Sequence, residues 1–262
     1  MARDHWSDGS AYEGYVGRWS RRIAERFVPW VGVARGGSWV DVGCGTGILT
    51  RAILDGADPG SVVGIDPSPG FLRTARAALR DPRVEFIEGS GGTLPVPDES
   101  ADGVVSGLVL NFIPEVDAAL VDMRRAARRE AVVAGYVWDY AGEMQLLRTF
   151  WDAATALDTS ARELDEGVRF PICRPEALEA AFTDAGLEEV EVAAIDVLTV
   201  FSDFDDYWNP FLSGVGPAPG YVVSLGEAAR GRLRDRLDTT LPREPDGTIE
   251  LIARAWAVRG AA

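Results

Sequence analysis

Short apolar runs alternate with amphipathic stretches through the first half of the chain, and this alternation predicts its secondary structure. Strands that alternate with helices indicate a mostly parallel sheet with helices on both faces. The runs that we interpret as buried strands are Trp39–Val42, Val62–Ile65, Val84–Ile87, Gly103–Leu110 and Ala131–Trp138. Helices are predicted over residues 48–54, from Ser68-Pro69 onward, and over Val116–Ala127.

The segment before the first strand has an apolar stripe at helical period. The stripe consists of Trp19, Ile23, Phe27 and Trp30. It predicts one or two helices between Tyr12 and Val31.

After residue 138 the pattern changes. The elements predicted there are helices over Met144–Leu157 and from Arg174-Pro175 to Gly186, and strands over Glu188–Phe201 and Thr248–Val258. The segment between these strands, residues 202–247, is too long for a hairpin, and we interpret it as an inserted cap. It contains an aromatic stretch at 204–211, a glycine and proline loop at 213–220, and a helix near 225–237.

Composition restricts the chemistry. The chain of 262 residues has 41 acidic and 26 basic side chains, a formal net charge of −15, one histidine and no lysine. Lysine-based catalysis is therefore excluded, and a histidine-rich metal site cannot form. The acidity argues against nucleic acid as a partner. Two cysteines far apart fit a reducing cytoplasm, and no apolar run approaches the length of a membrane span.

One stretch has the pattern of a ligand site. Asp41 lies near the end of the first strand, and Gly43, Gly45 and Gly47 follow before the first helix. A strand, a glycine turn and a helix start bind nucleotide-like ligands. Asp66 ends the second strand, where a carboxylate binds ribose hydroxyls. The third glycine comes one position too early for a dinucleotide fingerprint.

A Gly-x-Gly-x-Gly turn after an acidic residue resembles motif I of the class I S-adenosylmethionine (SAM) dependent methyltransferases, of the bacterial small-molecule, type 11-like kind. The resemblance extends over residues 36–140. Asp66 matches the second motif, residues 89–98 match the third, with Ser90 in place of an aspartate, and residues 106–112 match the fourth. By this resemblance the methyl donor contacts Asp41, Gly43, Gly45, Gly47, Asp66, Pro67, Ser90, Gly91, Leu108, Tyr15 and Arg18.

The resemblance also implies the architecture. We expect a doubly wound, Rossmann-like α/β fold with a mainly parallel seven-stranded sheet and an antiparallel last strand. Residues 1–35 would form a helical lid segment. Residues 36–262 would form the SAM-binding domain, with the cap insertion at about 202–247.

The implied activity is methyl transfer to a small-molecule acceptor in the cytoplasm, by a monomer or homodimer that uses no metal. The aromatic cap favours an uncharged or apolar acceptor. Asp139, Tyr140 and Tyr15 are the candidates for a catalytic base. Three alternatives stay open: a regulatory protein that binds SAM without turnover, a nicotinamide-dependent oxidoreductase, and an enzyme that uses the sulfonium for other chemistry.

Overall fold

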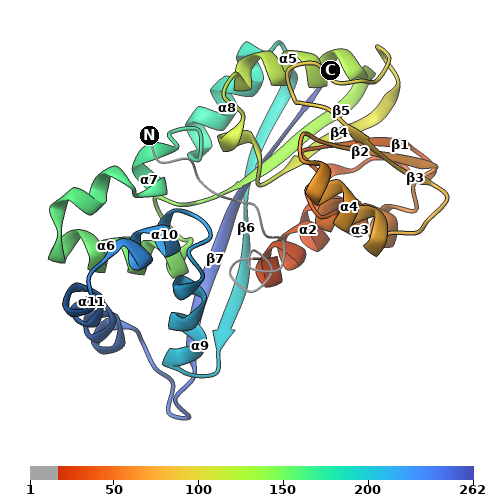
Figure 1. Ribbon diagram of the computed structural model, residues 1–262. Coiled ribbons are helices and arrows are strands. Elements are labelled where there is room, and N and C mark those ends of the chain that lie inside the picture. Colours follow the sequence, from red (N-terminus) through yellow and green to blue (C-terminus); the bar gives the residue numbers. More distant parts are fainter. Residues whose placement is uncertain (1–16) are drawn as a thin grey trace. The chain divides into compact units, whose positions relative to one another are not determined.

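Figure 1 shows the computed structural model of the protein, which describes residues 17–262. The described chain divides into two compact units. The sheet unit contains residues 20–138, 172–195 and 255–262. The helical unit contains residues 17–19, 139–171 and 196–254. Two long strands contribute residues to both units.

The strands form one mixed sheet. They are β1 (Ser38–Val42), β2 (Ser61–Asp66), β3 (Val84–Glu88), β4 (Ala101–Gly107), β5 (Ala127–Trp138), β6 (Glu188–Phe201) and β7 (Ile249–Ala261). Their order is β3-β2-β1-β4-β5-β7-β6. The pairings of β1 with β2 and of β1 with β4 are parallel, whereas β7 is antiparallel to β5. The predicted fold class, including the antiparallel last strand, is confirmed.

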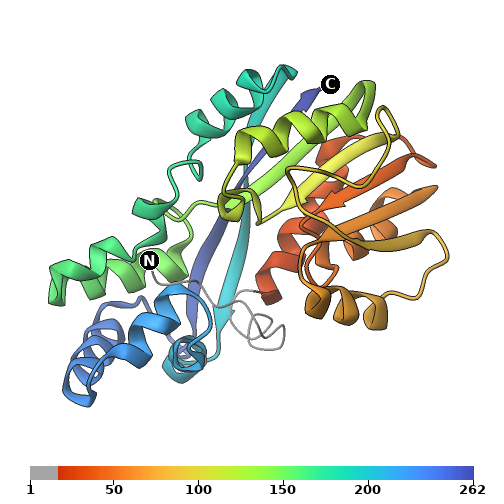
Figure 2. The same cartoon turned by 45° about the horizontal axis from the view of Figure 1, so that its top comes forward.

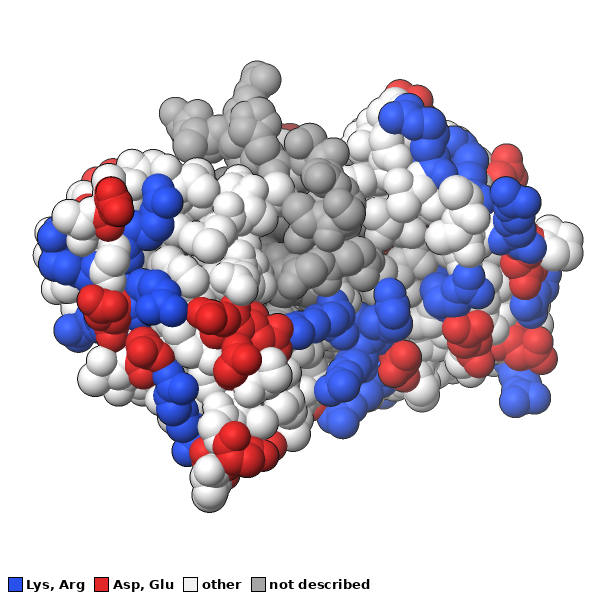
Figure 3. Space-filling view, turned by 60° about the horizontal axis from the view of Figure 1, so that its bottom comes forward, with Lys and Arg blue, Asp and Glu red and all other residues white. Residues whose placement is uncertain are grey.

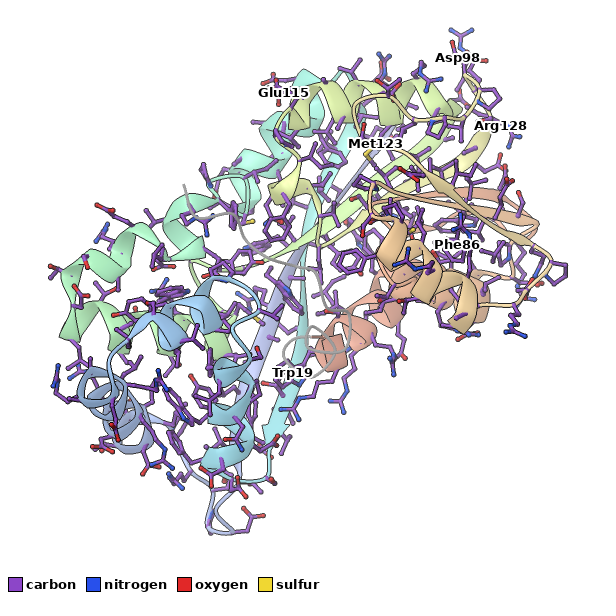
Figure 4. The ribbon with its side chains drawn as sticks, viewed as in Figure 1. Trp19, Phe86, Asp98, Glu115, Met123 and Arg128 are labelled. Carbon is purple, nitrogen blue, oxygen red and sulfur yellow. The ribbon has the colours of Figure 1, made fainter. Side chains whose placement is uncertain are left out.

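Helices cover both faces of the sheet unit. They are α2 (Arg18–Val31), α3 (Ile48–Ala57), α4 (Pro69–Ala78), α5 (Val116–Ala126) and α8 (Pro175–Asp184). Figure 2 shows α5 and α8 on one face and α2 and α4 on the other. On the α2 face the rings of Phe27 and Tyr136 lie 4.6 Å apart. On the α5 face the side chain of Met123 is fully buried (Figure 4).

The strand order reverses direction at β1, because β2 lies on one side of it and β4 on the other. At such a switch point the connections leave in opposite directions and a crevice opens beyond the carboxyl ends of the strands. The sheet unit therefore has its natural ligand position next to the glycine turn that follows β1.

The predicted start of α4 is confirmed in detail. Ser68 has an extended backbone, and its hydroxyl accepts a hydrogen bond from the amide of Phe71 at 3.3 Å. Pro69 occupies the first helical position, where its missing N–H costs nothing.

Strand β4 is shorter than predicted. It ends at Gly107, and residues Leu110–Phe112 form a 3-10 turn, η2, in place of extended strand. Leu108 has a φ of +60°, and its amide donates to the carbonyl of Tyr136 at 2.8 Å. This left-handed residue turns the chain out of the sheet at the edge where the crevice opens.

Strand β5 begins earlier than predicted, at Ala127, directly after α5. Arg128 and Arg129 consequently lie on this strand. Arg128 pairs with Asp102, and Arg125 of α5 pairs with Asp98 at 2.6 Å. Acidic and basic side chains are interspersed over the described surface of the face in Figure 3.

The outer strand β3 is short and carries exposed acidic residues, Glu85 and Glu88. The guanidinium of Arg76, on α4, donates to the carbonyl of Phe86 at 2.6 Å. The Phe86 ring is buried beneath α4 (Figure 4). One backbone acceptor of this strand is therefore already used within the chain.

Helices make up most of the helical unit. They are α6 (Gln145–Leu157), η3 (Thr159–Glu163), α7 (Glu166–Arg169), α9 (Phe204–Trp208), η4 (Asn209–Ser213), α10 (Pro217–Ser224) and α11 (Glu227–Thr240). The predicted loop at 213–220 is wrong for residues 217–220, which begin α10. Pro217 and Pro219 lie in its first turn, where backbone N–H groups have no intrahelical acceptor.

Aromatic side chains form the core of the helical unit. The rings of Phe150 and Phe211 stack with their centroids 4.6 Å apart. The buried hydroxyl of Tyr207 donates to the carbonyl of Leu146 at 3.1 Å. The aromatic stretch at 204–211 is thus packed against α6 and held by a hydrogen bond, as a core would be.

A buried carboxyl group lies in the same core. The indole N–H of Trp151 donates to Oε2 of Glu166, which is 3% exposed. Burial raises the pKa of Glu166 to about 8, although the Trp151 hydrogen bond opposes the rise. The neighbouring Asp165 accepts from Arg148 Nη2 at 2.8 Å. Both carboxyl groups are therefore paired within the unit.

Among residues 17–262, no helix is long and apolar enough to cross a lipid bilayer.

Candidate functional site

The glycine turn after β1 has the backbone conformation that the sequence predicted. Gly43, Gly45 and Gly47 have φ values of +73°, +54° and +90°, in the left-handed region that favours glycine. The amide of Gly43 donates to the carbonyl of Ile65 at 2.7 Å, so the turn is fastened to the end of β2. Gly47 then precedes the first residue of α3.

The three glycines of the turn differ in their surroundings. A Cβ on Gly43 would lie 2.5 Å from a methyl carbon of Val109, and one on Gly47 would lie 2.7 Å from Leu79. A Cβ on Gly45 would meet no atom within 4 Å. Gly43 and Gly47 permit close packing of the turn. Gly45 exposes its backbone to open space, so a ligand could approach the backbone closely there.

Asp66 joins the two loops at the switch point. Its Oδ2 accepts from the amide of Gly45 at 3.0 Å, and its Oδ1 accepts from the amide of Ser68 at 2.8 Å. Burial raises the pKa of Asp66, and these two hydrogen bonds oppose the rise. Each carboxylate oxygen can accept a second hydrogen bond, so the group can still receive the two hydroxyls of a ribose.

Asp41 lies on β1, two residues before Gly43, and is completely buried. The hydroxyl of Thr50 donates to its Oδ2 at 2.6 Å, while Oδ1 has no hydrogen-bond partner among the described residues. Burial raises the pKa of Asp41 to about 7, with the Thr50 hydrogen bond opposing and the charge of Asp66 adding to the rise. An unfilled buried acceptor is costly unless a ligand or water satisfies it.

Thr50 and Val109 contribute to the site but were not singled out from the sequence. Thr50 is a polar residue on the buried face of α3, and that break in an apolar stripe was the available signal. Val109 had no signal, because its contact with Gly43 depends on the turn at Leu108.

Two further polar atoms lie at the end of β4. The hydroxyl of Ser106 and the amide nitrogen of Asn111 are buried, and neither has a hydrogen-bond partner within residues 17–262. Leu108 itself is 9% exposed. The carboxyl ends of β1 and β4 therefore hold several polar atoms with unused hydrogen-bonding capacity.

The predicted adenine-side residues follow β3. The amide of Gly89 donates to the carbonyl of Asp66 at 3.3 Å, which places the start of this loop against β2. Ser90 is exposed, and Gly91 lies beside Val42, the last residue of β1. Pro67 is exposed after Asp66. The sheet unit thus brings the candidate residues from β1, β2 and β3 to one edge.

Asp139 of the helical unit closes the turn that follows β5. Its Oδ2 accepts from the amide of Glu143 at 2.8 Å, and its backbone carbonyl accepts from Gly142 and Met144. A Cβ on Gly142 would come within 2.5 Å of that Oδ2. These contacts fix the turn after β5 and leave Asp139 6% exposed.

The remaining candidates are on the helical unit or outside the described residues. Tyr140 is 6% exposed, and its ring lies 5.9 Å from that of Phe170. Arg18 pairs with Asp206 at 3.2 Å and stacks over the Trp19 ring at 4.4 Å. Tyr15 lies outside residues 17–262. The roles predicted for Tyr140, Tyr15 and Arg18 stay predictions.

Two properties of the site bear on its chemistry. Burial raises the pKa of the Cys44 thiol, which disfavours a nucleophilic thiolate in the turn. Within residues 17–262, no group of three or more histidine, cysteine or acidic side chains could hold a metal ion.

Known proteins resemble this chain in sequence. A family model described as a methyltransferase domain matches residues 40–134. The chain is 34% identical over 98 residues to a demethylmenaquinone methyltransferase of Roseiflexus sp.. That alignment covers 37% of this chain and 41% of the relative. It is 32% identical over 179 residues to the arsenite methyltransferase of Halobacterium salinarum, covering 66% of this chain and 43% of that protein. The chain therefore spans less than half the length of either relative.

A solved structure is similar in fold. Haemonchus contortus phosphoethanolamine N-methyltransferase 2, in complex with phosphomonomethylethanolamine and S-adenosylhomocysteine, aligns with a TM-score of 0.58 at 17% identity. The alignment covers 97% of this chain and 56% of that one. At this identity the likeness shows the fold alone.

Proposed function

Residues 40–134 belong to the methyltransferase domain family, and on that premise we propose that the whole protein transfers a methyl group from SAM to a small-molecule acceptor. The resemblance to the class I SAM-dependent methyltransferases is confirmed, and SAM is their cofactor. The product of the proposed reaction would be S-adenosylhomocysteine together with the methylated acceptor.

The residues at the edge of the sheet unit fit an adenosyl group. The observation that carries the proposal is Asp66, whose two oxygens fasten Gly45 and Ser68 and retain acceptor sites for a ribose. Gly45 leaves open space beside this carboxylate. A carboxylate at the end of β2 next to a glycine turn is the arrangement that binds a ribosyl ligand.

The protein's own contribution to the reaction would be alignment. SAM, when bound, supplies a methyl group on a sulfonium with a good neutral leaving group. The turn and Asp66 would fix the adenosyl end, and the buried polar atoms of Asp41, Ser106 and Asn111 lie at the adjoining strand ends. Holding the reacting atoms in line and excluding water would then accelerate transfer.

The names of two relatives support a small-molecule acceptor. One is a demethylmenaquinone methyltransferase, and the other is an arsenite methyltransferase. The basic side chains at Arg125 and Arg128 are paired with carboxylates, which gives little support to a nucleic-acid acceptor. An uncharged or apolar acceptor and a monomeric or homodimeric cytoplasmic protein stay predictions.

Calorimetry on cofactor-stripped protein tests the proposal. We expect S-adenosylhomocysteine and SAM to release heat with a 1:1 stoichiometry, and NADH to release none. Incubation with SAM and a panel of small acceptors should then give products heavier by one methylene unit. Binding without any transfer would favour a regulatory SAM-binding protein, and an absence of binding to either donor compound would refute the proposal.

A further inference from the structure

Arg18, the first residue of α2, is held between two aromatic rings of the helical unit. Its guanidinium carbon lies 4.4 Å from the centre of the Trp19 ring, which Figure 4 labels, and 4.9 Å from that of Phe201. The two rings contact each other edge to face, with their centroids 5.0 Å apart. Contact with two rings orients the cation and removes water from around it.

One edge of the Arg18 guanidinium has no acceptor. Its Nη1 lies 3.2 Å from Oδ1 of Asp206. Its Nε and Nη2 are buried, and neither has a hydrogen-bond partner among residues 17–262. Buried donors of a charged group cost free energy when no acceptor satisfies them. The arginine is therefore held in place with two donor atoms unused.

This edge has the geometry that binds a carboxylate. The Nε–H and Nη2–H bonds of an arginine are parallel and match the two oxygens of a planar carboxylate. Arg254, in the same unit, makes this match, because its Nε and Nη2 donate to the two oxygens of Asp196 at 2.7 and 2.8 Å. Arg18 has the same pair of donors and no such acceptor in the described part of the chain.

The surrounding charges favour an anion with a single charge. Asp206 already balances the guanidinium of Arg18. The neighbouring acidic residues are engaged, because Asp203 accepts from the amide of Asp206 at 2.8 Å and Asp205 pairs with Arg234 at 3.1 Å. These carboxylates repel a phosphate dianion more strongly than a monocarboxylate. The side chain of Arg18 is 37% exposed as a whole, so a small rotation of its long stem would present both donors to a ligand.

We propose that Nε and Nη2 of Arg18 bind the carboxylate of a small molecule, and that this molecule is the methyl acceptor. The second part rests on the proposed function. The residues that fit the donor's adenosyl group belong to the sheet unit, whereas Arg18 and the rings and carboxylate around it belong to the helical unit. This separation favours a second molecule over the donor's own carboxylate. The acceptor would then be charged, in contrast to the uncharged acceptor that the aromatic cap favoured.

Paired acids and amides test the inference. The probes are 4-hydroxybenzoate, 4-aminobenzoate and 4-hydroxyphenylacetate, each beside its primary amide, titrated by calorimetry into the full chain saturated with S-adenosylhomocysteine. We expect at least one acid to bind more than about tenfold more tightly than its amide, which lacks the charge. That acid should be methylated when SAM is supplied, whereas binding of an acid without transfer would overturn its assignment as the acceptor.

Variants of the arginine identify the group that holds the acid. Arg18→Gln should weaken binding of the acid about thirtyfold and leave its amide unaffected. Arg18→Lys keeps the charge but not the parallel donors, so it should restore only part of the affinity. Arg234→Gln is the matched control, because Arg234 is also paired with a carboxylate and lies 5.0 Å from the ring centre of Phe204. It should bind the acid as the unaltered chain does.

Three outcomes would overturn the inference and leave the proposed function intact. The first is that acids bind no better than amides to a chain that binds S-adenosylhomocysteine. The second is an equal loss in Arg18→Gln and Arg234→Gln. The third is that Arg18→Gln weakens S-adenosylhomocysteine but not 5′-methylthioadenosine, which lacks the amino-acid portion, because the donor's carboxylate would then occupy Arg18. Failure of the unaltered chain to bind S-adenosylhomocysteine would instead refute the proposed function.

Discussion

Each unit contains a pair of buried carboxyl groups, and the two pairs differ in the hydrogen-bonding capacity that remains on their oxygens. In the sheet unit Asp41 keeps one oxygen unpaired among the described residues, and Asp66 uses its oxygens to fasten two loops at strand ends. In the helical unit Glu166 is paired with Trp151 and Asp165 with Arg148. Burial raises the pKa of Glu166 to about 8 and that of Asp41 to about 7.

A raised pKa therefore does not by itself mark a ligand site in this protein. The distinguishing properties are the position at a switch point and the remaining hydrogen-bonding capacity. By both properties Asp41 and Asp66 of the sheet unit are the carboxyl groups that we propose for ligand binding, whereas Glu166 and Asp165 are paired within the core of the helical unit.

The largest effect that this comparison predicts is on ligand binding by Asp66→Asn. The amide keeps the size of the side chain but replaces one acceptor with a donor, so a ribose hydroxyl and a loop amide both lose their partner. We expect S-adenosylhomocysteine to bind about a hundredfold more weakly by calorimetry, equivalent to about 2.7 kcal/mol. Asp55→Asn, on the exposed side of α3, is the matched control and should bind as the unaltered chain does. Equal affinities would contradict the role of Asp66.

A somewhat smaller effect is predicted for the stability of the turn. Gly43→Ala places a Cβ 2.5 Å from Val109 at a φ of +73°, so the variant should lose about 2 kcal/mol in free energy of unfolding. Denaturant titration measures the loss. Gly92→Ala is the control, since its Cβ meets nothing within 4 Å, and it should change stability little. A similar loss in both variants would show that the Gly43 contact is unimportant.

The smallest effect concerns the pH dependence of the helical unit. Because the pKa of Glu166 is raised to about 8 from an ordinary 4.5, the folded chain holds its proton more tightly than the unfolded chain. This contribution to stability is complete below about pH 4.5 and is lost as the pH rises toward 8. Between pH 6 and 7 the unaltered chain should therefore lose on the order of 1 kcal/mol in free energy of unfolding through this group, and Glu166→Gln should not show that loss.

Denaturant titrations at the two pH values measure that difference. The groups that bear on Glu166 are Asp165, which raises its pKa, and Trp151 and Arg169, which lower it. Glu163→Gln, at an exposed position of η3, should keep the full pH dependence. Ligand affinity should be unchanged in Glu166→Gln, and a loss of binding there would undermine the distinction between the two pairs of carboxyl groups.

Much of the sheet unit could be predicted from the sequence because its signals are local. The first three strands were located to within one residue, since apolar runs bounded by glycine, proline or acidic residues mark their ends. The glycine turn and Asp66 followed from spacing alone. Ser68 and Pro69 predicted the start of α4 through capping preferences that act within a single turn.

The features that escaped prediction depend on residues distant in sequence. The end of β4 is set by Leu108, whose amide is bonded to Tyr136 of the next strand. No local pattern predicted a left-handed leucine there. The carboxylate of Asp139 was considered as a base, and its bonds within the 139–144 turn could be known only from the fold. Likewise the prolines at 217 and 219 were taken for loop residues, although a first helical turn tolerates them.

The hydrogen bond from Arg76 to the Phe86 carbonyl has a consequence beyond the site. An outermost strand invites another chain to add itself as the next strand, which begins edge-to-edge aggregation. At β3 an incoming backbone would find one acceptor occupied by a guanidinium, and two like-charged glutamates beside it. The β3 edge of the sheet is thereby protected from self-association at high protein concentration.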